Sequence, residues 1–277
     1  MRISIGHVSR YEYGAPASYS VQTLRLTPPS FAGQKVISWA ITAPGFDSAT
    51  PFRDSYGNAA HLVTFTGSHS ESLVIAKGVV DTEDRAGVVQ GLSELTPKRI
   101  YLRHTDKTQP GERVRALAET AAAASGLDRF HSLMALVTGA VAYKIGATTS
   151  GTTAEQALET GSGVCQDHAH VMIAAARLLG SPARYVSGYY VSGAEEAAEA
   201  HHAWAEVWID NLGWVGFDPA NSVCPDERYV RLATGLDAES SAPIRGTRRG
   251  GAFETLDVIV DVQQAATQQQ QQSNGQQ

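Results

Sequence analysis

Residues 161–167 read Gly-Ser-Gly-Val-Cys-Gln-Asp and lead into an apolar, alanine-rich run that stops before Gly180 and Pro182. This pattern predicts a helix from Val164 to Leu179 with Cys165 in its first turn, since glycine and proline are typical of a helix end. The first turn presents unpartnered N–H groups and the positive end of the helix dipole. These favour a thiolate over a thiol and can hold a developing oxyanion. Cys165 is therefore predicted to be a nucleophile rather than a small buried apolar side chain.

The stretch 201–209 supplies a candidate base, because a thiolate nucleophile needs a group that accepts and returns a proton. Strand alternation places small and aliphatic side chains on the buried face and His202 on the other, aromatic face. His201 has the opposite parity or lies in a loop. His202 is the preferred base for this reason.

Asp218 is the candidate for the group that orients the base. Residues 202–218 predict a hairpin whose turn is Asp210-Asn211-Leu212-Gly213. If the apolar faces of its strands coincide, Asp218 projects on the same side as His202, and diagonal neighbours lie about 7–8 Å apart. A register slip of one residue would reverse this side, and an aspartate before proline is also a common turn former.

The composition is that of a globular protein: the 277 residues are 43% hydrophobic and 18% charged, with a net charge of -6. We expect no nucleic-acid partner, because no basic stripe appears, and no membrane partner, because no apolar run approaches about 20 residues. The N-terminus lacks a signal-peptide apolar region, so a cytoplasmic protein is expected. The two cysteines form no disulfide framework, and Cys224 is expected to be structural or exposed.

The order of the patterns predicts an α+β protein. Residues 1–82 read as short strands of a β-sandwich-like domain, residues 83–111 as a connection, and residues 112–262 as the catalytic core. In the core, helices are predicted over 112–125, closed by Gly126, over 130–143, from N-cap Thr152 onward, and over 164–179. Strands are predicted over 183–191, 202–209, 213–218 and 254–262. The acidic segment 192–200 is expected to be a loop bordering the substrate groove, and the glutamine-rich residues 263–277 a disordered tail.

Four ordered stretches, read together, resemble the transglutaminase-like superfamily: Gly163 to His170, Pro182 to Tyr189, His202 to Val207, and Gly213 to Pro219. The opening of the chain is similar to the β domain that precedes the core in bacterial members, with cues at Tyr11 to Tyr13, Leu24 to Pro28 and Asp54 to Asn58. The resemblance implies a papain-like core, in which the helix bearing the cysteine packs on an antiparallel sheet behind a small all-β domain.

By this resemblance Cys165 is the nucleophile, His202 the general base and acid, and Asp218 the residue that orients His202. It implies acyl transfer at amide bonds of a protein or peptide substrate, by way of a thioester acyl-enzyme. Hydrolysis, as in a cysteine protease or amidase, is the first choice, and protein-glutamine transamidation is the alternative. The Cys165 N–H is expected in the oxyanion hole, with Tyr143 a second candidate by position alone. No cofactor or metal is assigned, and no acidic calcium loop is visible.

Two other interpretations stay open. Cys165, His168, His170, His201 and His202 could supply a zinc site, which predicts that His168 points toward Cys165 and leaves Asp218 without a role. A catalytically silent binding module is the second. The reactivity of Cys165 distinguishes it from an enzyme, because a binding module needs no activated thiol.

Overall fold

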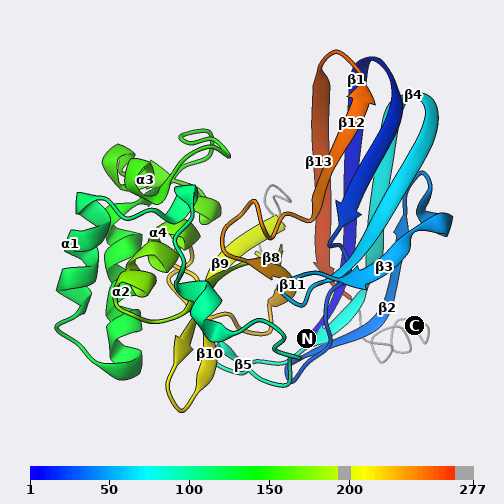
Figure 1. Cartoon of the computed structure of the whole chain (residues 1–277). Coiled ribbons are helices and arrows are strands. Elements are labelled where there is room, and N and C mark those ends of the chain that lie inside the picture. Colours follow the sequence, from blue (N-terminus) through cyan, green and yellow to red (C-terminus); the bar gives the residue numbers. More distant parts are fainter. Residues whose placement is uncertain (193–200, 266–277) are drawn as a thin grey trace, which may run out of the picture.

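The computed structural model describes residues 1–192 and 201–265 (Figure 1). As predicted, the fold is α+β: an N-terminal all-β part stands beside a core of helices packed on a sheet. Within the described residues no helix has the length and apolarity needed to cross a bilayer.

The N-terminal part is one antiparallel six-stranded sheet. Its strands are β1 (Arg2–Leu24), β2 (Gln34–Thr42), β3 (Thr50–Arg53), β4 (Ala59–Thr82), β12 (Ile244–Gly250) and β13 (Glu254–Gln264). Along β1 the odd-numbered residues from Ile3 to Tyr13 are buried, as strand alternation requires of a sheet with one covered face. The sequence predicts several short strands in a sandwich, whereas β1 and β4 run for 23 and 24 residues and pair with each other. Both strands run on without a turn, and the β1–β4 pairing shifts register around Ala17.

The chain returns to this sheet at its C-terminal end. The predicted strand over 254–262 exists as β13, but it pairs with β1 and so lies outside the catalytic core to which the sequence assigned it. β12, which the sequence pattern did not reveal, also pairs with β1. The period-2 pattern identifies a strand without specifying its partner, so the core boundary at residue 262 differs from the structure. Residues 266–277 of the predicted tail and 193–200 of the predicted acidic loop lie outside the described residues.

Over residues 1–192 and 201–265, the core combines four helices with a five-stranded sheet in the order β11-β8-β9-β10-β5. The strands are β5 (Val88–Val89), β8 (Ala183–Tyr190), β9 (His201–Ile209), β10 (Gly213–Phe217) and β11 (Tyr229–Gly235), and a separate parallel pair is β6 (Ala142–Tyr143) with β7 (Ser162–Gly163). The helices are α1 (Glu112–Ala121), α2 (Gly126–Ala140), α3 (Ala154–Thr160) and α4 (Cys165–Leu178); single turns are η1 (Phe46–Ser48), η2 (Lys98–Leu102) and η3 (Asp106–Thr108). Helix α4 is central, because β8 and β9 cover one side of it and the other helices cover the rest (Figure 1).

Two helix boundaries differ from the predicted ones. Gly126 begins α2 with a φ of 58° instead of closing the preceding helix, which already ends at Ala121. The N-cap of α3 is Thr153, which forms a capping box with Gln156, rather than Thr152. The carboxylate of Glu155 is consequently free to accept the N–H groups that open α1.

The N-terminal part is fastened to the core through the outer strand β11. The Gln34 amide donates to the Arg231 carbonyl at 2.9 Å and accepts the Arg231 N–H at 2.7 Å. The Asn58 amide makes the same pair of bonds with Thr234, at 2.7 and 2.8 Å. Both amides therefore satisfy backbone groups at the edge of the core sheet, and they hold the two parts in one arrangement.

Candidate active site

Cys165 is the first residue of α4, as predicted, and Val164 is its N-cap residue. The turn is held by Asp167, whose Oδ2 atom accepts the Val164 N–H at 2.9 Å and the Thr148 hydroxyl at 2.6 Å. Glycine is required at position 163, because a Cβ atom there would lie 2.6 Å from the same carboxylate oxygen. The N–H groups of Cys165 and Gln166 open the helix, where no preceding turn supplies carbonyl partners.

The histidines that follow Cys165 have structural roles. His168 places each ring nitrogen against a backbone carbonyl, Nδ1 at 2.9 Å from Val164 O and Nε2 at 2.8 Å from Val141 O. Nε2 of the fully buried His170 accepts the Ala238 N–H at 3.1 Å. His168 therefore does not serve as a metal ligand beside Cys165, and in the described ranges 1–192 and 201–265 no three His, Cys, Asp or Glu side chains gather as a metal site would require.

His202 and Asp218 lie together in the core. Nε2 of His202 is 2.7 Å from Oδ2 of Asp218, and both side chains are buried. In the hairpin Phe217 is opposite Ala205, so Asp218 is the diagonal neighbour of His202 on the same face of the sheet. The register that the sequence left open is thus the one that brings the two side chains together.

Two residues that sequence reasoning missed complete the surroundings of Asp218. Its Oδ2 atom accepts the Tyr229 hydroxyl at 2.7 Å and the Asn221 side-chain amide at 2.8 Å, and its Oδ1 atom accepts the Ala220 N–H at 3.0 Å. Asn221 is only three residues beyond Asp218, so its proximity could have been read from the turn. Tyr229 lies on β11, a strand that the sequence pattern did not reveal.

These contacts set the charge of the pair. Burial alone would lower the pKa of His202, but hydrogen bonds and charge interactions with Asp218 and Cys165 raise it to about 10. Burial by itself raises the pKa of Asp218, and the bonds from His202, Tyr229 and Asn221 outweigh that effect, so this pKa is lowered. These shifts favour an ionised carboxylate beside a protonated imidazole, and Cys165 is one of the groups that raise the pKa of that imidazole.

Cys165 opens into a groove of about 720 Å³ that lies between the core and the N-terminal sheet. Val164, Cys165 and His201 belong to its core side, and residues of β1 and β13, including Tyr11 and Val258, form the opposite side. The groove is within the size range of ligand sites. The N-terminal part thus supplies one wall of the space in front of the candidate nucleophile.

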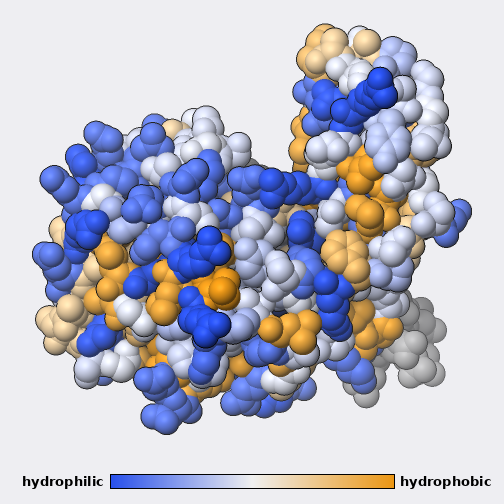
Figure 2. All heavy atoms as spheres, viewed as in Figure 1, coloured by the Kyte–Doolittle hydropathy of each residue, from blue (hydrophilic) through white to orange (hydrophobic). Residues whose placement is uncertain are grey.

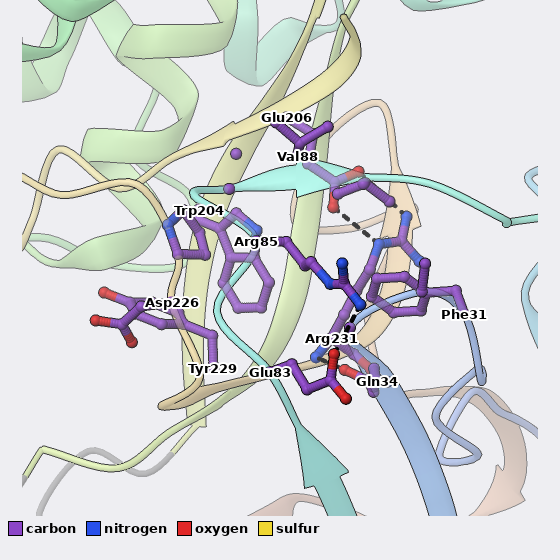
Figure 3. Close-up of a pocket in the computed structure, with 16 residues that line it drawn as sticks. Phe31, Gln34, Glu83, Arg85, Val88, Trp204, Glu206, Asp226, Tyr229 and Arg231 are labelled. Atoms are coloured by element: carbon purple, nitrogen blue, oxygen red, sulfur yellow. Dashed lines mark hydrogen bonds and ion pairs between the residues drawn. The ribbon is translucent and has the colours of Figure 1, made fainter. Parts of the chain in front are cut away.

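A smaller pocket lies on the aromatic face of the core sheet, and Cys165 does not line it (Figure 3). At its wall Glu206 accepts the Arg231 guanidinium at 2.8 Å, and beyond the pocket it accepts Arg184 at 2.6 Å. Trp204 and Tyr229 line the same pocket, and both also pack against His202. This buried ion network stabilises the strand that carries His202. We therefore assign the pocket a structural rather than a catalytic role.

The remaining candidates are not brought into the triad. His201 contacts His7 and Tyr189, with ring centroids 6.1 and 6.2 Å away, and lines the groove. Cys224 packs at the edge of the core, where burial raises its pKa to about 11. Tyr143 pairs through its backbone with Gly163, two residues before Cys165.

Two protein-family models match the chain. The transglutaminase-like superfamily model covers residues 112–219, and the model of the bacterial transglutaminase-like N-terminal region covers residues 3–81. The first match contains Cys165, His202 and Asp218, and the second covers most of the N-terminal sheet.

Three similar proteins come from bacteria. An uncharacterized protein of Mycobacterium leprae is 29% identical over an alignment of 280 positions that covers 96% of this chain and 99% of that protein. A protein-glutamine gamma-glutamyltransferase of Pseudomonas aeruginosa is 34% identical over 104 residues, 34% of this chain and 16% of the relative. The solved structure of a proposed cysteine protease from Cytophaga hutchinsonii has a TM-score of 0.73 at 20% identity and covers 96% of this chain and 91% of its own. That last likeness establishes the fold of both parts.

Proposed function

The chain belongs to the transglutaminase-like superfamily, and we propose that it is a cysteine-nucleophile enzyme that hydrolyses amide bonds of a protein or peptide substrate. The observation that carries the proposal is the buried bond between His202 and Asp218, set behind a cysteine at a helix N-terminus. Asp218 is bonded by three side chains, those of His202, Asn221 and Tyr229. A silent binding module has no need for a carboxylate held against a histidine in this way. The three residues are proposed as nucleophile, general acid and base, and orienting group.

In the proposed reaction the Cys165 thiolate attacks the amide carbonyl carbon, and the carbon–sulfur bond forms as the oxygen becomes negative. N–H groups at the start of α4, that of Cys165 first, stabilise this oxygen. Protonated His202 gives its proton to the departing nitrogen, the carbon–nitrogen bond breaks, and a thioester remains. Water then attacks the thioester while His202 takes its proton, and the acid product leaves with regeneration of the thiolate and the protonated imidazole.

Transamidation is the second candidate, favoured by the 34% identity over 104 residues to a protein-glutamine gamma-glutamyltransferase. In that reaction a primary amine takes the place of water at the thioester. The first step, and the roles of Cys165, His202 and Asp218 in it, are the same for both outcomes.

The test is incubation of wild type, Cys165→Ala and Cys224→Ala with a mixed protein substrate, with and without a primary amine, followed by mass spectrometry. Cleaved peptides or deamidated glutamines in wild type and Cys224→Ala, absent from Cys165→Ala, support hydrolysis. Amine adducts at glutamine with the same dependence on Cys165 support transamidation. A Cys165 that is alkylated no faster than an ordinary buried thiol refutes both.

A further inference from the structure

Strand β13 has an open edge that faces the core. Over its length β13 pairs with β1, and in the described part of the chain it forms no second strand pair. Figure 1 shows β13 on the side of the upright N-terminal sheet nearest the core. A long open edge is a ready template for another strand and is normally blocked by charge, proline or a covering element. Here the edge runs along the groove in front of Cys165.

The hydrogen-bond pattern identifies which backbone groups this edge presents. Gly14 N–H donates to Phe253 O at 2.9 Å, and Ala265 N–H donates to Arg2 O at 2.8 Å, both in the register of the β1–β13 pair. In an antiparallel ladder the bonded residues alternate, so odd-numbered residues of β13 bond to β1. The N–H and C=O groups of the even-numbered residues, Leu256 and Val258 among them, therefore point to the open edge.

The side chains of the same even-numbered residues line the groove. Leu256 and Val258 are 49% and 46% exposed, and Val260 continues the row toward the core. Figure 2 shows hydrophobic residues on this edge of the N-terminal sheet. One row of residues thus offers both free backbone partners and an apolar surface, the two features that recognise an extended peptide by strand addition.

The walls of the groove also carry little charge. Burial lowers the pKa of His7 to about 3 and that of His201 to about 4, so both rings are neutral at pH 7. The described residues of the lining include one acidic side chain, Asp261, and no lysine or arginine. An acidic segment would meet a like charge and apolar surface, whereas an uncharged segment meets no such penalty.

We propose that this groove binds the substrate as an extended strand that pairs with the open edge of β13 and lays apolar side chains on Leu256 and Val258. The inference rests on the proposed function, because the strand is the substrate whose amide reaches Cys165. It gives the N-terminal sheet a direct part in substrate selection, and it defines the substrate class as extended, uncharged, apolar peptide segments.

The test compares how fast Cys165 of the full chain reacts with three reagents, each of which loses a halide as sulfur bonds to its carbon. They are iodoacetamide and two peptidyl chloromethyl ketones, Val-Ala-Val-Gly and Glu-Ala-Glu-Gly. We expect the apolar peptide reagent to react at least about tenfold faster than the acidic one. Val258→Lys should lower the apolar rate about tenfold and leave the iodoacetamide rate unchanged.

The matched control is Ile37→Lys, on β2 outside the groove, where the native side chain is 45% exposed. It should change neither rate, and Leu256→Lys should reproduce the effect of Val258→Lys. Strand pairing is tested by methylating the backbone nitrogen at two successive residues of the apolar reagent, one at a time. Because the N–H groups of a strand point alternately to its two edges, one methylated reagent should react with Cys165 about tenfold more slowly and the other should react at the unmethylated rate.

Each outcome is decisive. Slow iodoacetamide labelling of Cys165 in every variant would refute the proposed function itself. Fast labelling with equal rates for apolar and acidic peptides, or equal losses for both methylated reagents, would overturn the groove proposal alone. A wild-type dimer by light scattering that Val258→Lys converts to a monomer would also overturn it, since a second copy would then occupy the edge.

Discussion

Nε2 of His202 lies 2.7 Å from Oδ2 of Asp218, although the two residues are diagonal rather than direct neighbours in the β9–β10 hairpin. The bond depends on the hairpin register, which places both side chains on one face, and on burial, which leaves neither of them a competing water. The geometry fits a carboxylate that holds the imidazole in one orientation.

Asp218→Asn should remove most of the activity while leaving the fold intact. The amide keeps the size of the carboxylate but lacks its charge, so His202 loses the partner that favours its protonated form. We expect the rate of amide turnover to fall about 10³–10⁴-fold, the scale seen for this change in serine protease triads. Turnover of the mixed protein substrate, with a thermal melt as the folding control, measures it. Activity within tenfold of wild type would exclude the orienting role.

Tyr229→Phe should cause a smaller loss. It removes the 2.7 Å bond to Asp218 and keeps the ring that packs against His202. We expect about tenfold lower turnover and about 1 kcal/mol less free energy of unfolding, the usual value of one buried hydrogen bond.

Tyr190→Phe is the control for that change. Tyr190 packs against the same histidine, with a centroid distance of 5.4 Å, but its hydroxyl accepts from Arg228 rather than donating to Asp218. The loss of this partly buried bond, which does not involve Asp218, should leave turnover within about twofold of wild type. If Tyr190→Phe and Tyr229→Phe lowered turnover equally, the bond from Tyr229 to the carboxylate would have no specific effect on turnover.

The sequence predicted the positions of Cys165, His202 and Asp218 in the core better than it predicted their surroundings. Cys165 could be placed at a helix start, and His202 and Asp218 on one face of a hairpin, because local patterns carry that information. Tyr229 and the groove depend on which strands become neighbours. Strand alternation says nothing of that choice, so the return of β13 to β1 beside the candidate site could not be read from residues 254–264.

The activity should fall as pH rises through about 10. The pKa of His202 is raised from its ordinary value of 6.5 to about 10, so the imidazole keeps its proton across the neutral range and loses it above that. Without the proton it cannot release the departing amine. A pH profile of turnover checks this. In Asp218→Asn, which removes the main interaction that raises the pKa of His202, the residual turnover should have its descending limb at lower pH. A descending limb near pH 6.5 in wild type would contradict the assignment.

The two cysteines should differ sharply in reactivity. Burial raises the pKa of Cys224 to about 11, so at pH 7 its thiol is almost wholly protonated, while Cys165 faces protonated His202 at a helix N-terminus. We expect iodoacetamide to label Cys165 at least about a hundredfold faster, as read from the two cysteine peptides by mass spectrometry. Preferential labelling should disappear when the protein is unfolded in urea. Similar rates at the two positions in the native protein would argue for the binding-module interpretation.

Glu206→Gln tests the buried ion network behind the site. Glu206 is fully buried between Arg184 and Arg231, at 2.6 and 2.8 Å, and removing its charge leaves two buried guanidinium groups with too little compensation. We expect a loss of about 3–5 kcal/mol in the free energy of unfolding, measured by urea denaturation. Glu71→Gln breaks an exposed ion pair with Arg10 at 2.9 Å and should cost less than about 1 kcal/mol. If both variants lost the same free energy of unfolding, the buried network would stabilise the protein no more than a surface ion pair does. The strand that carries His202 would then be supported by Trp204 and Tyr229 instead.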